Sequence, residues 1–225
     1  MSTCELIINS LISFFASFIG VLLVLWIERQ RRPKLSMSIG GPNYLKENDV
    51  LGRPECKWLR VFIKNRDVPR FILWFYQGEP ALSCQAKITF FHLDKQKVFD
   101  REMEGRWAGS QEPKSESIDT INGLAYRLVV FQHTYDIPSG EGADLDIAIR
   151  LNGEEECYGW TDESYINNWK HPQWKLDRGR YIAKISIKTG GREFSDAFYI
   201  VNDIPYNDFR LAPVEHKIKK EILKS

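Results

Sequence analysis

The pattern of hydrophobic and polar residues divides the chain into one long apolar run and a series of short alternating segments. Residues 6–27, LIINSLISFFASFIGVLLVLWI, contain no charged side chain. A helix of that length reaches about 33 Å, enough for the roughly 30 Å hydrocarbon core of a bilayer. The one charged residue before the run is Glu5, whereas a cleaved signal peptide starts with basic residues. The run therefore predicts a transmembrane helix.

After Pro33 the pattern takes the two-residue period of a strand. Residues 57–65 place Leu59, Val61 and Ile63 on one face. Residues 143–151 alternate in the same way. The expected apolar face consists of Leu145, Ile147, Ile149 and Leu151. The expected solvated face consists of Asp144, Asp146 and Arg150. Many short strands at this spacing predict a mainly β fold, an antiparallel β-sandwich of about seven to nine strands behind one transmembrane α-helix.

Turn signals join several of these strands. Further strands are expected at residues 34–40, 81–93, 96–103 (a hairpin partner of the strand before it), 125–132, 180–188 and 192–202. The sequence NGEE after Leu151 and TGG after Lys188 predict hairpin turns. Residues 105–120 are interpreted as a long connection with Trp107 as an anchor. The predicted organisation is a short start (1–5), the helix (6–27), a basic linker (28–33), the sandwich (34–211) and a basic amphipathic tail (212–225).

A late strand carries a recognisable entry, formed by Leu176, Gly179 and Tyr181. This Leu-x-x-Gly-x-Tyr pattern resembles the tyrosine corner of immunoglobulin-like sandwiches. Ala183 stands where antibody-type domains have a cysteine, so the resemblance implies no disulfide between the sheets. Residues 59–65 followed by 81–91 also resemble the opening of bacterial CARDB-like domains. These resemblances imply a fold and no particular activity.

Charge and cysteine content predict the orientation. Basic residues follow the helix and none precedes it; they are Arg29, Arg31, Arg32 and Lys34. The positive-inside rule then predicts a single-pass protein with its N-terminus outside and its C-terminal domain in the cytoplasm. None of the four cysteines forms a C-x-x-C pair, which favours reduced thiols over a disulfide framework.

One predicted loop, residues 66–80, contains six consecutive large apolar or aromatic residues. By strand alternation this loop lies near the membrane. Its candidate contact residues are Arg70, Phe71, Leu73, Trp74, Phe75 and Tyr76. The loop either rests among lipid headgroups or docks a partner's helix, or it forms an additional buried strand or plug at the end of the sandwich.

A second aromatic segment, residues 157–174, is predicted at the end away from the membrane. Its candidate ligand-binding or partner-binding residues are Tyr158, Trp160, Tyr165, Trp169, His171 and Trp174. Rigid aromatic rings beside polar side chains suit a peptide, nucleotide or sugar. The alternative is that these rings anchor a loop that crosses between the sheets.

Two amphipathic features offer further surfaces. A stripe of small or weakly polar residues along the predicted transmembrane helix consists of Asn9, Ser13, Ala16, Ser17 and Gly20. Such stripes let helices associate in lipid, although single-pass anchors also tolerate them without a partner. In the tail, Val214, Ile218 and Ile222 predict a short basic helix that meets acidic lipid or a partner, or frays in water.

Composition and motifs favour binding over catalysis. The formal net charge of +1 provides no global field for nucleic acid. No phosphate-binding loop, nucleophile elbow, zinc-protease motif or dinucleotide fingerprint is present. We therefore expect no enzyme, no cofactor and no metal. We expect instead a membrane-anchored adaptor that recruits a protein or small ligand, with the lipid bilayer and a protein partner or second copy as partners. The alternatives are an extracytoplasmic ligand-binding domain, and a membrane effector triggered by ligand binding and helix association.

Overall fold

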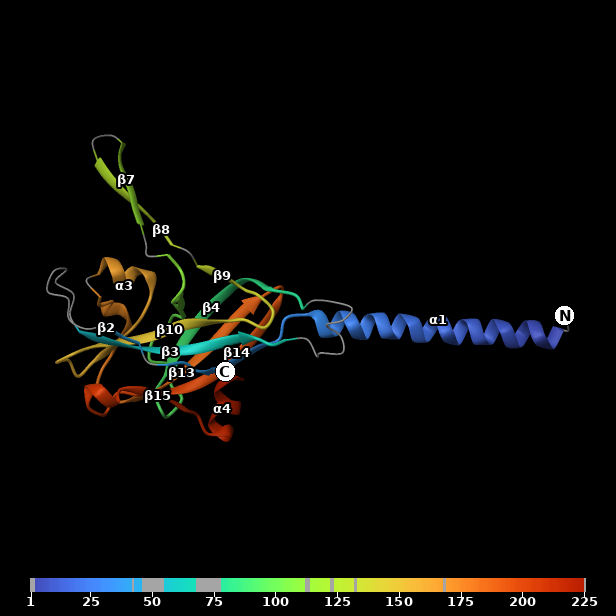
Figure 1. Cartoon of the computed structure of the whole chain (residues 1–225). Coiled ribbons are helices and arrows are strands. Elements are labelled where there is room, and N and C mark those ends of the chain that lie inside the picture. The colour runs from blue at the N-terminus through green and yellow to red at the C-terminus, as the bar shows by residue number, and fades with distance from the viewer. Residues whose placement is uncertain are drawn as a thin grey trace.

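Two antiparallel sheets packed face to face form the body of the protein, and one long helix extends from it (Figure 1). The structure is a computed structural model that describes residues 3–41, 43–45, 55–67, 78–111, 114–121, 124–131, 133–167 and 169–224. For residues 3–10, 43–45, 114–121, 124–130 and 166 it describes the backbone alone. The mainly β architecture confirms the fold class predicted from the alternating pattern.

The first sheet, here called the β3 sheet, has seven strands. Its main path follows the order β1, β3, β10, β11 and β12, while β2 also pairs with β3 and β6 with β10. The bounds are β1 (Leu35–Ile39), β2 (Asn43–Leu45), β3 (Cys56–Asn65), β6 (Arg106–Trp107), β10 (Gly142–Leu151), β11 (Cys157–Gly159) and β12 (Lys175–Leu176). The long strands β3 and β10 form the centre of this sheet.

The second sheet, the β13 sheet, has six strands in the order β15, β14, β13, β4 and β5, with β9 also paired to β4. The bounds are β4 (Ala81–Phe91), β5 (Met103–Glu104), β9 (Thr134–Ile137), β13 (Arg180–Thr189), β14 (Arg192–Val201) and β15 (Arg210–Pro213). The β13–β14 hairpin turns at Gly190 and Gly191, whose φ angles are +53° and +73°. Positive φ at both central residues is what a two-residue hairpin turn requires of glycine, as the TGG signal predicts.

The main core lies between the two sheets. Leu59, Val61 and Ile63 all point into it, as their spacing predicts. Trp107 is fully buried there and stacks on Tyr135 with ring centroids 5.5 Å apart, which confirms its expected role as an anchor. The described residues form more strands than the seven to nine expected. Several additional ones, such as β5, β6 and β12, are two residues long, too short to show any periodicity.

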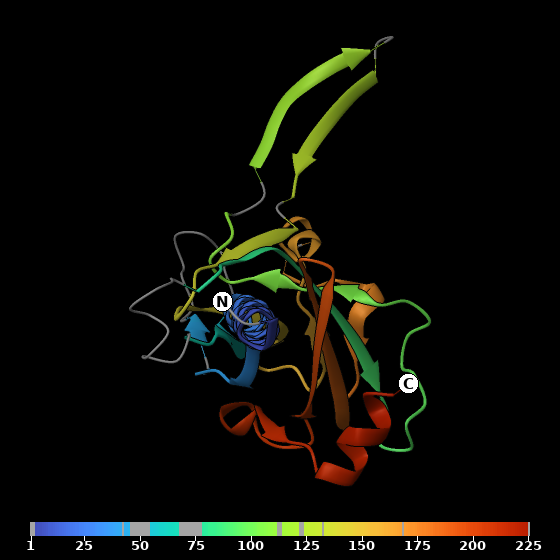
Figure 2. The same ribbon diagram turned by 90° about the vertical axis from the view of Figure 1, so that its right-hand side faces the viewer.

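The expectation of a long connection at residues 105–120 is wrong. This segment contains β6 and also β7 (Lys114–Ile121), which pairs with β8 (Leu124–Val130) in a separate two-stranded hairpin. The hairpin projects sideways from the sandwich (Figure 2). A strand of the sandwich is expected at residues 125–132, but residues 125–130 pair with β7 instead. The sequence signal that identifies this hairpin is Asn122-Gly123, a favoured pair for a two-residue turn.

The predicted hairpin partner of residues 81–93 forms only in part. Lys97 bridges to Phe91, and Met103 pairs with Ile88 through β5. The intervening residues form no ladder with β4, although the Val98 N–H donates to the Phe90 carbonyl oxygen at 2.9 Å. The chain therefore folds back as expected, but it pairs at two separate points.

A β-bulge overturns the expected alternation in β10. The register with β3 shifts between Asp146 and Ala148. Because one extra residue reverses the side-chain alternation, Leu145 and Ile147 enter the main core, whereas Ile149 and Leu151 face the outer side of the β3 sheet. Asp146, expected on a solvated face, is buried. The cause is local: β6 pairs with this part of β10 and covers it.

The predicted tyrosine corner forms its defining contact. The Tyr181 hydroxyl donates a hydrogen bond to the Asp177 carbonyl oxygen at 3.1 Å. Leu176 is buried in the main core. A Cβ atom at Gly179 would lie 3.6 Å from the Tyr181 ring, in ordinary van der Waals contact. The corner ties the start of β13 to the chain that enters it.

The C-terminal segment belongs to the sandwich rather than to a free tail. The helix α4 (His216–Ile222) packs against the outer face of the β13 sheet through Val214, Ile218 and Ile222. Their neighbours there include Phe91 and Ile182. The apolar side of this helix is therefore occupied by its own domain, which corrects the expectation that it meets lipid or a partner, or frays.

The helix α1 (Thr3–Arg31) extends from the sandwich as a straight rod (Figure 1). Its described side chains from Leu11 to Leu25 are exposed, and the segment Leu11–Arg31 is long and apolar enough to cross a membrane. The predicted stripe lies on this helix; Ser13, Ala16, Ser17 and Gly20 are exposed, and the side chain of Asn9 lies outside the described residues. Helix association through this stripe stays a prediction.

Asn65 connects the end of α1 to the sandwich. Its side chain is fully buried and donates hydrogen bonds to the carbonyl oxygens of Glu79 and Ile137 at 3.0 and 3.2 Å. Its amide oxygen accepts a bond from the Lys34 backbone N–H. The Glu79 N–H also donates to the Arg31 carbonyl oxygen at 3.0 Å. These bonds hold the helix exit, β3 and the start of β4 together.

Candidate functional site

The distal aromatic segment covers the outer face of the β3 sheet. Tyr158, Trp160, Trp169 and Tyr165 pack with Trp58 in a second apolar cluster. Trp160 is fully buried and stacks on Trp169 with centroids 5.5 Å apart. Figure 1 places α3 (Asp162–Ile166), which carries this segment, at the end of the sandwich away from α1. Four of the six candidate residues thus form one internal cluster, and ligand contact at them stays a prediction.

The two remaining candidates lie beside this cluster. Trp174, in the short helix η1 (Pro172–Trp174), belongs to the main core and meets Phe99 edge-on at 5.1 Å. His171 is buried, and its Nε2 lies 2.6 Å from a carboxylate oxygen of Glu163. Its Nδ1 is buried without a hydrogen-bond partner among the described residues.

Trp169 adopts an unusual backbone conformation. Its φ of +69° lies in the left-handed region, which a bulky side chain rarely occupies. Its backbone N–H donates to the Ser164 carbonyl oxygen at 2.9 Å, and its ring is enclosed by Trp58, Trp160 and Tyr165. The stacking energy of these rings offsets the conformational cost of roughly 1–3 kcal/mol. The segment is therefore held in one specific shape.

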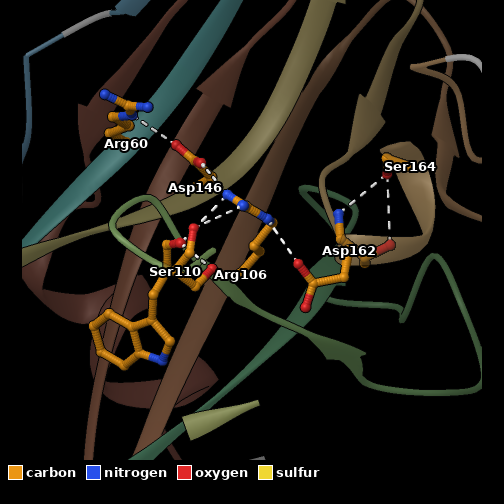
Figure 3. Close-up of polar contacts among 8 residues, drawn as sticks. Arg60, Arg106, Ser110, Asp146, Asp162 and Ser164 are labelled. Atoms are coloured by element: carbon orange, nitrogen blue, oxygen red, sulfur yellow. Dashed lines mark hydrogen bonds and ion pairs between the residues drawn. The ribbon is translucent and has the colours of Figure 1, made fainter. Parts of the chain in front are cut away.

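A chain of buried charges runs along the same face (Figure 3). Arg60 Nε lies 2.6 Å from one oxygen of Asp146, and Arg106 lies 3.8 Å from the other. Arg106 Nε donates to Asp162 Oδ1 at 2.7 Å. The network joins β3, β10, β6 and α3, three elements of one sheet and the helix that covers it. Sequence reasoning missed it because only the bulge and β6 bring these residues together.

Arg106 is the centre of this network and makes contacts through all three nitrogens of its guanidinium. Besides Asp146 and Asp162, it donates to the carbonyl oxygens of Trp107 and Ser110 at 3.3 and 3.1 Å. Its guanidinium carbon lies 4.6 Å from the centre of the Tyr165 ring, a cation–π distance. The arginine thus fixes both the chain leading to the β7–β8 hairpin and the position of α3.

Burial shapes the acid chemistry of the two carboxyl groups. Desolvation raises the pKa of Asp162 above its usual value, and the neighbouring Arg106 opposes that rise. Desolvation likewise raises the pKa of Asp146, against the effect of Arg60 and Arg106. Each carboxylate therefore depends on its arginine partner to stay charged.

A pocket of about 180 Å³ opens beside this network. Its lining includes Arg106 and Asp162 and the aromatic residues Trp174 and Phe131. Phe131 follows β8, so the base of the projecting hairpin forms part of the rim. Of the six aromatic candidates from the sequence, Trp174 is the one that lines this pocket.

Further charged groups surround the opening. His133 Nδ1 lies 2.9 Å from a carboxylate oxygen of Glu104, and both side chains are exposed. Glu163 also lines the pocket, as does Arg101 at its exposed edge. Among the described residues, no group of three histidine, cysteine, aspartate or glutamate side chains is arranged to hold a metal ion.

The cysteines offer no reactive thiol in the described part of the chain. Cys56, Cys84 and Cys157 are free and buried. Burial raises the pKa of the Cys84 and Cys157 thiols above the usual value, so both stay protonated at neutral pH. Buried, protonated thiols of this kind pack as small apolar groups.

The membrane-proximal candidates, Arg70 to Tyr76, lie outside the described residues. The described residues on either side of this segment end at Asp67 and resume at Gly78. Asn65 and Glu79, which flank the segment, are both hydrogen-bonded at the exit of α1. The segment therefore starts and ends at the helix end of the sandwich, and its contacts stay a prediction.

Comparison with known proteins adds no family to these observations. No protein-family model matches the chain, and a search of curated proteins finds no match. Any function must therefore be argued from the geometry of the chain itself.

Proposed function

We propose that this chain is a non-catalytic binding or adaptor module tethered to a membrane by α1. The observation that carries the proposal is the pocket at the end of the sandwich opposite α1, built on the buried Arg106 network. Such networks hold binding groups in a fixed geometry, so little ordering is required when a ligand binds. The module recruits a protein or small ligand and raises its effective concentration at the bilayer.

We further propose that the sandwich is immunoglobulin-like, with a CARDB-like opening of its strands. The Tyr181 contact and the two antiparallel sheets support this assignment. That class of fold commonly presents binding surfaces at the ends of the sandwich, where its loops cluster. The pocket lies at one such end, among the segments that follow β5, β8 and β11.

The basic residues after α1 support a cytoplasmic position for the sandwich. The free, buried cysteines are compatible with that reducing compartment. The hydrogen bonds of Asn65 support a fixed orientation of the domain relative to α1, which would hold the pocket away from the bilayer.

Site-specific photo-cross-linking in intact cells tests this proposal. A photoreactive residue replaces Gln173, which is exposed and lines the pocket, in the full chain. The control carries the same residue at Glu193, exposed on β14. We expect a light-dependent mass increase, from a protein or a small molecule, at position 173 and none at 193. Equal labelling of both positions, or none at 173, would contradict a binding site in the pocket.

A further inference from the structure

The charges that face the pocket are unbalanced in a specific way. Four carboxylate groups and two guanidinium groups line it. The carboxylates are Glu102, Glu104, Asp162 and Glu163, and the guanidinium groups are Arg101 and Arg106. Counted over these six side chains, the lining therefore carries an excess of negative charge.

The partners of these groups determine which charges are left for a ligand. Arg106 is shared by Asp146 and Asp162 and has its donors committed to carbonyl oxygens as well. Arg101 is exposed and also borders an adjoining open groove, so it stands at the mouth. Glu102 pairs with Lys87 at 3.3 Å. The excess of carboxylates and the pairing of Arg106 with Asp146 and Asp162 therefore both disfavour an anionic ligand in this pocket.

Asp162 provides a hydrogen-bond acceptor for a cationic ligand. Its side chain is only 10% exposed. One carboxylate oxygen accepts from Arg106, and the other has no hydrogen-bond partner within the described part of the chain. Figure 3 shows the carboxyl group with one oxygen toward Arg106 and the other turned away from it. Because Asp162 lines the pocket, a ligand there can donate a hydrogen bond to this second oxygen.

The apolar lining narrows the chemistry. Trp174 and Phe131 belong to the same lining as Asp162, and aromatic rings attract cations. A cavity of about 180 Å³ is smaller than the pockets that enclose drug-sized ligands and suits a group of side-chain size.

We propose that this pocket binds an organic cation, an ammonium or guanidinium group on a short apolar stem. The cation donates to Asp162, lies against Trp174 and is drawn in by Glu104 and Glu163 at the rim. This inference rests on the proposed binding function and specifies its ligand. The cation can come from a free small amine or from a lysine or arginine side chain of a partner protein.

Ligand-observed NMR on the full chain in detergent tests the charge requirement. The probes are n-butylammonium and a short peptide with one central lysine; n-butanol and the norleucine version of the peptide are their neutral controls. We expect both cations to bind and both neutral controls to fail. Binding of the peptide alone identifies a protein side chain as the source, and comparable binding of n-butylammonium identifies a free amine. Equal binding of charged and neutral probes overturns the proposal.

Variants locate the binding. Asp162→Asn should weaken cation binding roughly tenfold or more, because a charge-assisted bond is lost. Since this change also touches Arg106, the exposed Glu104→Gln is measured in parallel, with an expected loss of about two- to fivefold. Glu193→Gln, on the other sheet, should leave binding unchanged. If Glu104→Gln and Asp162→Asn both bind cations as the unaltered chain does, the proposal is wrong.

The two proposals fail separately. Cross-linking at Gln173 without any preference for cations refutes the ligand class and keeps the binding function. If neither cross-linking at Gln173 nor cation binding is seen, both proposals are refuted.

Acidification provides a second check: because burial raises the pKa of Asp162, lowering the pH removes its charge and should weaken cation binding.

Discussion

At the scale of single residues, Tyr181 shows how one side chain fixes a crossing of the chain. Its hydroxyl bonds the Asp177 carbonyl oxygen, and the ring is buried. Tyr181→Phe removes this bond and leaves the Asp177 carbonyl oxygen with one partner fewer. We expect the free energy of unfolding to fall by about 1 kcal/mol, measured by urea denaturation of the full chain in detergent.

Tyr199→Phe is the matched control for this measurement. Tyr199 lies opposite Ile182 in the neighbouring strand, and its hydroxyl makes no hydrogen bond within the described residues. Its loss should change stability by less than about 0.5 kcal/mol. Equal stability of Tyr181→Phe and the unaltered chain would show that the corner does not contribute as assigned.

The sequence predicts this corner because its residues are close together in the chain. It does not predict Asn202, whose fully buried side chain donates to the carbonyl oxygens of Glu155 and Asp177 and accepts from Arg150. These partners lie 25 to 52 residues away. Long-range polar contacts depend on strand order, and strand order is not visible in local periodicity.

At the scale of elements, the bulge in β10 decides where the buried charges lie. Asp146 separates Arg60 from Arg106. Asp146→Ala leaves two guanidinium groups, one of them buried, without their shared counter-charge. We expect a loss of about 3–5 kcal/mol, the usual cost of removing one partner from a buried ion pair. The midpoint of urea unfolding measures it.

Asp144→Ala provides the control on the same strand. Asp144 precedes the bulge and makes no ion pair among the described residues. Its replacement should change stability by less than about 0.5 kcal/mol. Similar midpoints for the two variants would mean that the Asp146 network does not stabilise the fold.

The elements also show why sequence reasoning found only part of the site. Alternation predicts β3 and most of β10, because it reports which face of a strand is apolar. It assigned Asp146 to a solvated face, since a bulge reverses the alternation without any change in composition. Trp174 and the distal segment were identified from their aromatic content. Arg106 and Asp162 were not, because neither sits in a motif that a local pattern reveals.

At the scale of the whole molecule, α3 lies at the end of the sandwich opposite α1, and it contributes Asp162 and Glu163 to the pocket (Figure 1). The compartment that the pocket faces therefore depends on how α1 inserts. The helix has Arg29 and Arg31 in its last turn, and Arg32 and Lys34 follow it. Two acidic residues, Glu28 and Glu79, form ion pairs with Arg31. Acidic residues contribute little to insertion, so the count of basic residues still predicts a cytoplasmic sandwich.

Reporter fusions at Ser225 test this orientation in the full chain. A reporter active only in the cytoplasm should give signal, and its counterpart active only outside should give none. A control variant reverses the balance of basic residues across the helix and should shift the signal to the second reporter. It combines Arg29→Gln and Arg32→Gln with Ser2→Lys and Thr3→Lys. Extracytoplasmic signal from the unaltered chain would refute the cytoplasmic adaptor. The same pocket would then bind a ligand of the cell exterior, and Cys56, Cys84 and Cys157 would have to stay unpaired in an oxidising compartment through burial alone.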